Sequence, residues 1–469
     1  MDATELAYAG IAAQAQLIAA GEISSRELVD LYLERIDRLD GRLNAFRVVL
    51  AERARLEADQ ADARRGAGGE RPLLGVPIAI KDDVDVAGEV TAFGTNAYGD
   101  PARADAEVVR RLREAGAVII GKTNVPELTL WPFTETATFG ATRNPWDRQR
   151  APGGSSGGSA SAVAAGLVGA ALGSDGAGSI RIPAAWCGLF GLKPQRGRIS
   201  MLPRVSPWYG LSVNGVLTRR VADTALFHDV ASTDGTGDGP PAPPAPFAQL
   251  AATPPGRLKI AFSRRVPVGT ILRLDRDAAR ALEETVELLR SLGHDVSEHD
   301  PDYGMSGLEP VLVRYLRGGH DDAQAMAHPE RLERRTRGFA RLGGLIPPAL
   351  VQRSLAGEAE FTRRLNGVLA DHDVLLTPAT AMPPPRIGQL QGRGALWTLN
   401  AVAAMVPYNG VWNVTGQPAA SIPAGHGADG LPRGVQMVGR PNDEGTLLSL
   451  AAQIEAERPW AQQRPPEFS

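Results

Sequence analysis

Serine and lysine are the residues of this sequence whose types and spacing could do chemistry. Ser155 lies in a Gly/Ser-rich segment, residues 153–159, and Ser179 lies in a second small-residue turn, residues 174–179. Lys81 ends a short apolar run. A serine hydroxyl becomes a good nucleophile when a nearby base accepts its proton. Lysine can be that base once burial lowers its pKa, so these residues favour a serine nucleophile activated by lysine.

Histidine, the more usual base, is absent from the part of the sequence that holds these residues. All seven histidines lie at position 228 or later. The pattern Gly-x-Ser-x-Gly at 153–157 also marks the nucleophile of α/β-hydrolases, and His372 or His426 could then serve as its base. That motif requires a strand directly before the serine, whereas residues 144–150 are polar and turn-like.

The Gly/Ser-rich segment has two further interpretations. A phosphate-binding Walker loop ends in Gly-Lys followed by Ser or Thr, and the segment has no such ending. A flexible linker is the usual role of Gly/Ser tracts, but an apolar stretch containing Arg181, Trp186 and Cys187 follows closely. We therefore expect an ordered site built from hydroxyls and backbone N–H groups, which glycine leaves open to close approach.

The composition is that of an ordinary globular protein. The chain has 469 residues, 43% hydrophobic residues and a net charge of −3, without a long basic run, so we expect no nucleic-acid partner. The longest apolar run, about 162–172, is broken by glycine and is too short to span a bilayer. No signal peptide is visible, and a single cysteine excludes an internal disulfide framework and a cysteine-cluster zinc site. We expect a cytoplasmic monomer or homodimer with no membrane partner.

Short apolar runs alternate with amphipathic segments along the chain, and this alternation predicts an α/β fold. Residues 3–21 have apolar positions at helical spacing and are expected to form one helix. The runs 74–80 and 117–120 are expected to be buried strands, the first of which delivers Lys81 at its end. The Pro- and Gly-rich segment 232–256 is expected to be a linker or an exposed insertion.

Five stretches of the sequence resemble the amidase signature family of serine amidohydrolases. They are residues 75–82, 121–124, 140–146, 151–199 and 434–441. The resemblance covers nearly the whole chain and implies the fold of that family, a central mixed β-sheet covered by helices on both faces. It implies one domain, 1–469, with N-terminal helices in 1–70, the signature core in 71–230, and the remainder in 257–469, where variable helices lie near the substrate pocket.

The resemblance also implies a Ser–cis-Ser–Lys triad. Ser179 would be the nucleophile, Lys81 the base and Ser155 the bridging serine, joined to Gly154 by a cis peptide bond. Ser156 is the nearest rival for the bridging role, but the spacing of 24 residues before the nucleophile favours Ser155. Such an enzyme cleaves an amide through a serine acyl-enzyme and needs no metal or cofactor.

The turn that carries the nucleophile would stabilise the negative charge of the reacting carbonyl oxygen. Its expected oxyanion hole consists of the backbone N–H groups of Gly176, Ala177, Gly178 and Ser179. Asp175 and Arg181 either brace this turn or form a plain structural ion pair. Ala177 departs from the usual family pattern, and it can donate its N–H provided that its φ need not be positive.

The family places its acyl pocket after a Pro-Glu-[Leu/Phe] motif, residues 126–128 here, and among the variable helices. The aromatic residues expected near this pocket are Trp131, Phe133, Trp208, Tyr209, Tyr408 and Trp412. Together they favour a small-molecule amide with an apolar or aryl acyl group.

Two rival functions remain open at this point. One is a glutaminase that resembles the A subunit of glutamyl-tRNA amidotransferase and works with partner chains, although residues 408–418 look more like those of free-standing amidases. The other is a binding module on an inactive amidase scaffold, which the presence of Lys81, Ser155 and Ser179 disfavours.

Overall fold

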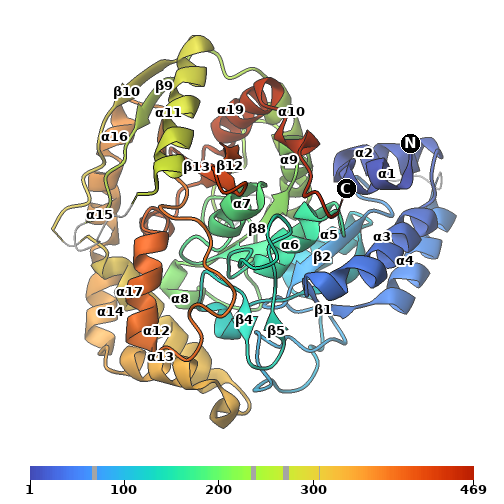
Figure 1. The fold of residues 1–469 in the computed structure, drawn as a ribbon, viewed down its shortest axis with the longest axis horizontal. Helices are drawn as coiled ribbons and strands as arrows, with labels where there is room; N and C mark the ends of the chain where they lie inside the picture. Colours follow the sequence, from blue (N-terminus) through green and yellow to red (C-terminus); the bar gives the residue numbers. More distant parts are fainter. Residues whose placement is uncertain (66–70, 234–238, 268–273, 306, 469) are drawn as a thin grey trace.

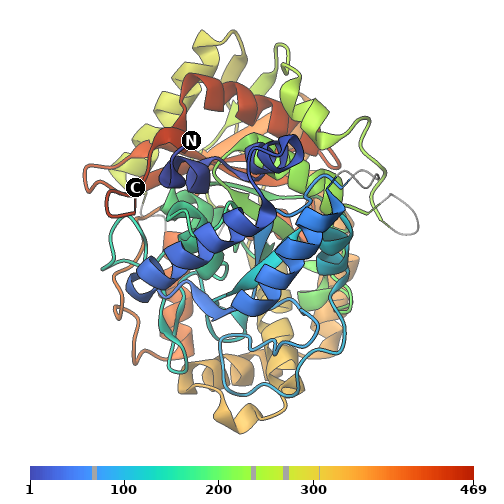
Figure 2. The same cartoon turned by 90° about the vertical axis from the view of Figure 1, so that its right-hand side faces the viewer.

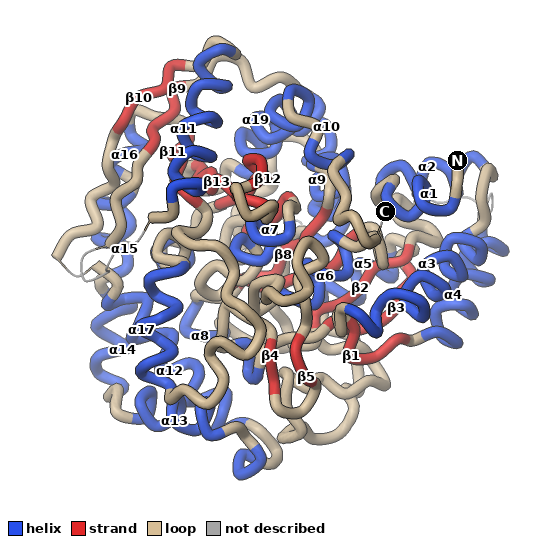
Figure 3. Tube along the Cα trace, viewed as in Figure 1, coloured by secondary structure: helices blue, strands red, loops and turns tan. Residues whose placement is uncertain are grey.

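One mixed β-sheet runs through the molecule and is covered by helices on both faces (Figures 1 and 3). The structure, a computed structural model, describes residues 1–65, 71–233, 239–267, 274–305 and 307–468. The order of the strands in the sheet is β1-β3-β2-β6-β8-β7-β12-β13-β11-β9-β10. The expected α/β fold with a central mixed sheet is therefore confirmed.

The strands of this sheet are β1 (Phe46–Val49), β2 (Pro77–Lys81), β3 (Val118–Thr123), β6 (Ala170–Asp175), β7 (Phe190–Lys193), β8 (Val213–Thr218), β9 (Lys259–Phe262), β10 (Asp295–Glu298), β11 (Val374–Pro378), β12 (Ala419–His426) and β13 (Pro432–Gly439). A separate antiparallel pair consists of β4 (Glu135–Thr136) and β5 (Gly140–Ala141).

The helices are α1 (Ala3–Tyr8), α2 (Ile11–Ala20), α3 (Ser25–Leu39), α4 (Ala51–Arg64), α5 (Glu107–Glu114), α6 (Gly157–Ala164), α7 (Arg181–Cys187), α8 (Pro207–Gly210), α9 (Val221–Ala231), α10 (Phe247–Ala252), α11 (Arg276–Ser291), α12 (Glu309–Ala325), α13 (Arg334–Gly344), α14 (Pro348–Ala356), α15 (Glu358–Leu365), α16 (Gly367–Ala370), α17 (Ala395–Met405), α18 (Val411–Val414) and α19 (Glu444–Glu457). Short 3-10 helices are η1 (Asp40–Arg42), η2 (Glu127–Thr129), η3 (Pro329–Arg331) and η4 (Trp460–Gln462).

The two faces of the sheet enclose different cores, because successive side chains of a strand point to opposite faces. In β11, Val374 and Leu376 belong to an apolar cluster that includes Leu447 of α19. Leu375, between them, belongs to a second cluster that includes Phe339 of α13. Such continuous apolar runs are typical of strands buried on both faces.

The strands that carry the candidate residues end at the same edge of the sheet. β2 lies between β3 and β6 and runs parallel to both. Parallel neighbours place their carboxyl ends together, and polar groups collect there in α/β folds. Lys81 closes β2 and Asp175 closes β6, so the predicted base and the predicted nucleophile turn start from adjacent positions.

The expected single helix over 3–21 is wrong, because the chain breaks between α1 and α2. Gly10 has a φ of 87°, a conformation that glycine adopts at little cost. A side chain from far along the chain completes the start of α2: Asp223 in α9 accepts a hydrogen bond from the Ala12 N–H at 2.8 Å. Periodicity within 3–21 carries no signal of this distant partner.

The segment 232–256 is only partly a linker. It contains α10, in which Phe247 is buried, and the N–H groups of Phe247 and Ala248 donate to the Asp229 carboxylate at 2.5 and 2.9 Å. Residues 234–238 lie outside the described part of the chain. Residues 247–252 therefore form a helix and not a linker, and the burial of Phe247 and Ala251 shows that this part of the segment is not a fully exposed insertion either.

The two ends of the chain meet beside the N-terminal helices, which lie across one side of the sheet (Figures 1 and 2). The Tyr8 hydroxyl and the Arg35 guanidinium each donate to the Phe468 carbonyl at 2.9 Å. None of the helices in the described part of the chain has the length and apolar character required to cross a bilayer.

The carboxyl that caps α2 predicts an unusual dependence of stability on pH. Asp223 is completely buried, and burial raises its pKa from 3.8 to about 7. Between these values the unfolded chain has lost this proton while the folded chain keeps it, so stability falls as pH rises. At about 1.4 kcal/mol per pKa unit, the loss amounts to at most about 4 kcal/mol by pH 7.5. Asp223→Asn keeps an acceptor for Ala12 and should remove this loss.

Urea unfolding of the wild type and Asp223→Asn at pH 4.5 and pH 7.5 checks the prediction. The two proteins differ only at residue 223, so the difference between their free energies of unfolding reports the contribution of Asp223. A difference in the free energy of unfolding that is the same at both pH values would contradict it.

Candidate active site

Lys81 is completely buried, and its amine contacts two serine hydroxyls. The Nζ atom donates to Ser155 Oγ at 2.8 Å and to Ser174 Oγ at 2.6 Å, and the Ser174 carbonyl lies at 3.3 Å. The Gly154–Ser155 peptide bond is cis. The structure therefore brings the predicted base and the predicted bridging serine into direct contact.

The surroundings of Lys81 act on its proton affinity in opposite directions. Burial lowers the pKa of Lys81, because the protein interior solvates an ammonium poorly. The Asp83 carboxylate, with Oδ2 at 3.4 Å from Nζ, raises the pKa again, as does Asp175, while Arg204 lowers it. The net pKa of Lys81 lies below its usual value, which makes the side chain suitable as a base.

Ser179 lies, partly exposed, in the turn between β6 and α7. The Ser156 N–H donates to the Ser179 carbonyl at 3.2 Å, so the Gly/Ser-rich segment and the nucleophile turn lie side by side. Among the hydrogen bonds of the described residues, none joins the Ser179 hydroxyl to Ser155. The link between these two serines therefore stays a prediction.

Ser156, the rival for the bridging role, has a different environment from Ser155. Its hydroxyl donates to the Ser174 carbonyl at 3.2 Å and accepts from the Ser174 N–H at 3.3 Å. These contacts attach it to the backbone of β6, whereas Ser155 contacts the lysine amine.

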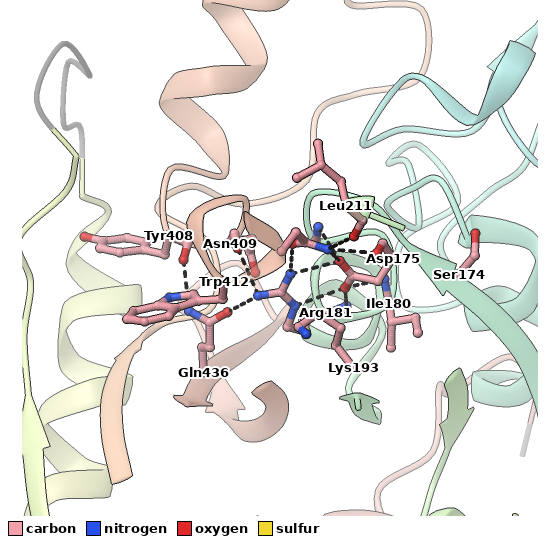
Figure 4. A network of polar contacts seen from close by, with 12 residues as sticks. Ser174, Asp175, Ile180, Arg181, Lys193, Leu211, Tyr408, Asn409, Trp412 and Gln436 are labelled. Atoms are coloured by element: carbon pink, nitrogen blue, oxygen red, sulfur yellow. Dashed lines mark hydrogen bonds and ion pairs between the residues drawn. The ribbon is translucent and has the colours of Figure 1, made fainter. Parts of the chain in front are cut away.

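Asp175 and Arg181, which precede and follow the nucleophile turn in the sequence, form a completely buried ion pair (Figure 4). Arg181 donates from Nε and from one terminal nitrogen to the two carboxylate oxygens of Asp175, at 3.0 and 2.9 Å. The same carboxylate accepts from the N–H groups of Gly178 at 2.7 Å and Ile180 at 3.1 Å. Burial alone would raise the pKa of Asp175, but Arg181 holds it well below its usual range. The pair therefore braces the turn and is also a structural ion pair.

The backbone of this turn shows whether Ala177 has to adopt a positive φ. The positive φ, 118°, falls on Gly178 and not on Ala177. A side chain at Gly178 would collide with Asn409 and Ile182, since a Cβ atom there would lie 2.7 Å from each. The Gly178 N–H is already donated to Asp175. Within the described residues, the N–H groups of Gly176, Ala177 and Ser179 donate to no other group, and these three stay candidates for the oxyanion hole.

Side chains from the far end of the chain complete the network around Arg181 (Figure 4). One terminal nitrogen of the guanidinium donates to Gln436 Oε1 at 2.7 Å and the other to Asn413 Oδ1 at 2.6 Å. Asn413 also donates to the Asp175 carboxylate at 2.9 Å. Sequence reasoning missed Asn413 and Gln436, although Gln436 lies in the stretch 434–441 that carries the family resemblance and Asn413 lies in residues 408–418, which look like those of free-standing amidases. A glutamine inside the apolar strand 433–438 was the available signal.

A family model described as Amidase matches residues 27–448 of this chain. The chain belongs to the amidase signature family. As a member it is an amidohydrolase that acts on the carbon–nitrogen bond of amides.

Relatives of this amidase match it over almost its whole length. A Mycobacterium tuberculosis protein (strain ATCC 25618 / H37Rv) named "Putative amidase AmiB2" is 56% identical over 465 residues, 99% of each chain. The 6-aminohexanoate-cyclic-dimer hydrolase of Paenarthrobacter ureafaciens is 36% identical over 490 residues, 97% of this chain and 95% of that one. A solved structure of 6-aminohexanoate cyclic dimer hydrolase complexed with substrate superposes with a TM-score of 0.90 at 33% identity, covering 99% of this chain and 100% of that one.

The aromatic residues expected near the substrate do not all lie in the same place in the amidase. Trp131, Phe133, Trp208 and Trp412 are buried in the apolar cluster that also holds Phe339. Trp208 lies against the nucleophile turn, since a Cβ atom on Gly176 would lie 2.7 Å from its ring. The Tyr209 hydroxyl donates to Asp321 at 2.5 Å, and the Tyr408 hydroxyl to the Arg264 carbonyl at 3.0 Å.

A cavity of about 240 Å³ adjoins the base through Asp83. Its wall is partly apolar, with Phe93, Leu128, Met201 and Met326. Leu128 belongs to the Pro-Glu-Leu motif at residues 126–128. None of the six predicted aromatic residues lines this cavity in the described part of the chain, so their role at the substrate stays a prediction.

The amidase places neither candidate histidine in contact with a candidate nucleophile. His372 contacts the Val368 carbonyl and Ser297, and His426 packs on Trp146 with the ring centroids 4.7 Å apart. Residues 144–150 form turns rather than the strand that the α/β-hydrolase motif requires. In the described residues, no three His, Cys, Asp or Glu side chains are placed to hold a metal ion.

Proposed function

We propose that this amidase cleaves its substrate through an acyl-enzyme on Ser179, with Lys81 as the base and Ser155 as the proton relay. The observation that carries the proposal is the completely buried Lys81 amine, which lies 2.8 Å from Ser155 Oγ. The contact between Ser156 and the Ser179 carbonyl supports it, because it places the relay segment beside the nucleophile turn.

In the acylation step, neutral Lys81 accepts a proton from Ser155 while Ser155 accepts one from Ser179. The Ser179 oxygen then forms a bond to the amide carbonyl carbon. The N–H groups of Gly176, Ala177 and Ser179 are the candidates that would stabilise the oxyanion, and losing one such donor typically costs about 2.7–4 kcal/mol of transition-state stabilisation.

Collapse of the tetrahedral intermediate breaks the carbon–nitrogen bond. The proton held by Lys81 returns through Ser155 to the departing nitrogen, which leaves as a neutral amine or ammonia. A water molecule then gives a proton to the same relay, attacks the ester carbonyl and releases the carboxylic acid, and Ser179 recovers its proton.

The substrate that this site favours is a small amide with an apolar or aryl acyl group. Support comes from the indole of Trp208 against Gly176 and from the apolar part of the cavity wall beside Asp83. An amide panel should include glutamine, which a glutaminase would prefer, and the cyclic dimer of 6-aminohexanoate, which two relatives are named for. We expect kcat/KM for aryl and alkyl amides to exceed that for glutamine by about tenfold or more, because burying even a few methylene groups in an apolar pocket gives discrimination of this size.

Labelling with a fluorophosphonate tests the nucleophile, because this probe forms a covalent bond with an activated serine. Intact-mass spectrometry should find one adduct on the wild type, none on Ser179→Ala, and slow labelling of Ser155→Ala. Labelling that persists in Ser179→Ala and disappears in Ser155→Ala would overturn the assignment of the nucleophile.

A further inference from the structure

A carboxylate that the proposed reaction does not use lies directly beside the base. Asp83 follows β2 by two residues, is 8% exposed, and places Oδ2 3.4 Å from Lys81 Nζ. Ser174 of β6 contacts both groups: its hydroxyl donates to Asp83 Oδ2 at 2.5 Å and accepts from Lys81 Nζ at 2.6 Å. The amine, the hydroxyl and the carboxylate therefore touch one another pairwise.

We propose that Asp83, acting with Ser174, is a positioning residue that directs the free electron pair of Lys81 to Ser155 and sets how tightly this amine holds a proton. The inference rests on the proposed role of Lys81 as the base. It adds to the triad a carboxylate and a hydroxyl that hold the base in its working orientation.

The first part of the proposal, that Asp83 and Ser174 direct the electron pair of Lys81 to Ser155, rests on which groups around Nζ can donate a hydrogen bond and which can only accept one. A neutral amine has two N–H groups and one electron pair. The Asp83 carboxylate and the Ser174 carbonyl can only accept. Since Ser174 gives its only hydroxyl hydrogen to Asp83, its oxygen must also accept from Lys81. Nζ donates to Ser155 while it is protonated; in the neutral amine this 2.8 Å contact is the remaining one that can reverse, with the Ser155 hydroxyl donating to the electron pair.

Without the Asp83 carboxylate, the Ser174 hydroxyl would be free to rotate. It could then donate its hydrogen to Lys81 at the short distance of 2.6 Å and occupy the electron pair that Ser155 needs. Asp83 thus prevents a competing hydrogen bond as well as attracting the amine.

The second part of the proposal, that Asp83 sets how tightly Lys81 holds a proton, rests on its negative charge. The charged groups that act on Lys81 are Asp83, Asp175 and Arg204, and Asp83 has the largest effect among the three. An adjacent negative charge favours the ammonium, so it opposes the effect of burial on the pKa of Lys81. Removing this charge should lower the pKa of Lys81, and the activity should then persist to lower pH. The base would also be weaker, so the maximal rate should fall.

The neighbouring residue provides a matched control. Asp82 is also buried, but its carboxylate pairs with Lys122 at 2.9 Å and Arg47 at 2.5 Å and, within the described structure, forms no hydrogen bond or ion pair with the Lys81 amine. Asp82→Asn therefore removes a buried carboxylate of the same kind at the same strand end without changing the groups around Nζ.

The experiment is the pH profile of kcat/KM, between pH 5 and 10, for the wild type, Asp83→Asn and Asp82→Asn. For Asp83→Asn we expect the acid limb to move to lower pH by about one to three units, and the plateau to fall about tenfold or more. The acid limb of Asp82→Asn should coincide with that of the wild type. An acid limb that stays in place in Asp83→Asn, or one that moves equally in Asp82→Asn, would overturn the proposal.

Ser174 gives a second readout should Asp83→Asn fail to fold. Ser174→Ala removes the hydroxyl between the amine and the carboxylate and should lower the plateau, and Ser174→Thr should restore it. Wild-type activity in Ser174→Ala would overturn the proposal. Fluorophosphonate labelling of Ser179 in the wild type separates this inference from the proposed function: if Ser179 is labelled and the acid limb does not move, only the role of Asp83 is lost.

Discussion

Lys81→Met should reduce kcat/KM by about 10⁴-fold or more, because the catalytic groups of a serine hydrolase act as a unit and the loss of one removes most of the benefit of the others. Methionine has a similar length but no group that can take the proton of Ser155. The relay would then end at a serine hydroxyl, a far weaker base. Steady-state kinetics on a reactive anilide and the rate of fluorophosphonate labelling should both show the loss.

Lys122→Met is the matched control for this prediction. Lys122 lies in β3, the strand parallel to β2, is completely buried, and binds Asp82 and the Thr91 hydroxyl at 2.9 Å each. Both substitutions bury a methionine and leave a carboxylate without its lysine, so both should lower the melting temperature. A loss of activity that is as large in Lys122→Met would show that the effect is structural, and Lys81→Met at a tenth of the wild-type activity would refute Lys81 as the base.

Arg181→Met should destabilise the protein by about 3–5 kcal/mol, because it leaves the Asp175 charge buried without its partner. The pKa of Asp175 should rise on losing the guanidinium that holds it down. A protonated Asp175 binds the N–H groups of Gly178 and Ile180 more weakly, so the turn that carries Ser179 should loosen. We expect kcat to fall about 10²- to 10³-fold, the usual cost of a displaced oxyanion donor.

Arg198→Met is the matched control, because it should lower the stability of the protein without disturbing the turn that carries Ser179. Arg198 is also completely buried and pairs with buried Glu444 at 3.0 Å, but neither residue contacts the nucleophile turn in the described structure. Urea unfolding should show a similar loss for both variants, whereas kcat, measured well below the unfolding transition, should fall only in Arg181→Met. Equal values of kcat for the two variants would contradict a role of the Asp175–Arg181 pair in shaping the site.

The mixed sheet and the residues of the signature stretches could be predicted from the sequence because local signals carry them. Short apolar runs marked β2 and β3, and small residues marked the two turns that hold Ser155 and Ser179. The contact between Lys81 and Ser155 was expected from the family resemblance, which includes the separate stretches 75–82 and 151–199. The assignment of chemical roles to these residues stays a prediction.

Other features depend on partners that sequence patterns do not reveal. The helix that starts after the break at Gly10 is capped by Asp223, more than two hundred positions away. The spacing of apolar residues within 3–21 does not reveal this partner. The run Lys81-Asp82-Asp83 gives no sign in the sequence of how its charges pair, and in the structure the two carboxylates pair with different lysines inside the protein. Helix α10 was missed because its short apolar sequence lies in a Pro- and Gly-rich surrounding.

The dependence of the nucleophile turn on the far end of the chain has a consequence for biosynthesis. Arg181 binds groups that lie 228 to 255 positions later, and β12 and β13 fill the sheet between β7 and β11. A nascent chain released before these strands emerge would contain Lys81, Ser155 and Ser179 but not the partners that fasten the turn. Amide hydrolysis should therefore begin only after β12 and β13 have been made, and a premature stop codon before position 409 should yield an inactive product even though every residue of the proposed triad has been made.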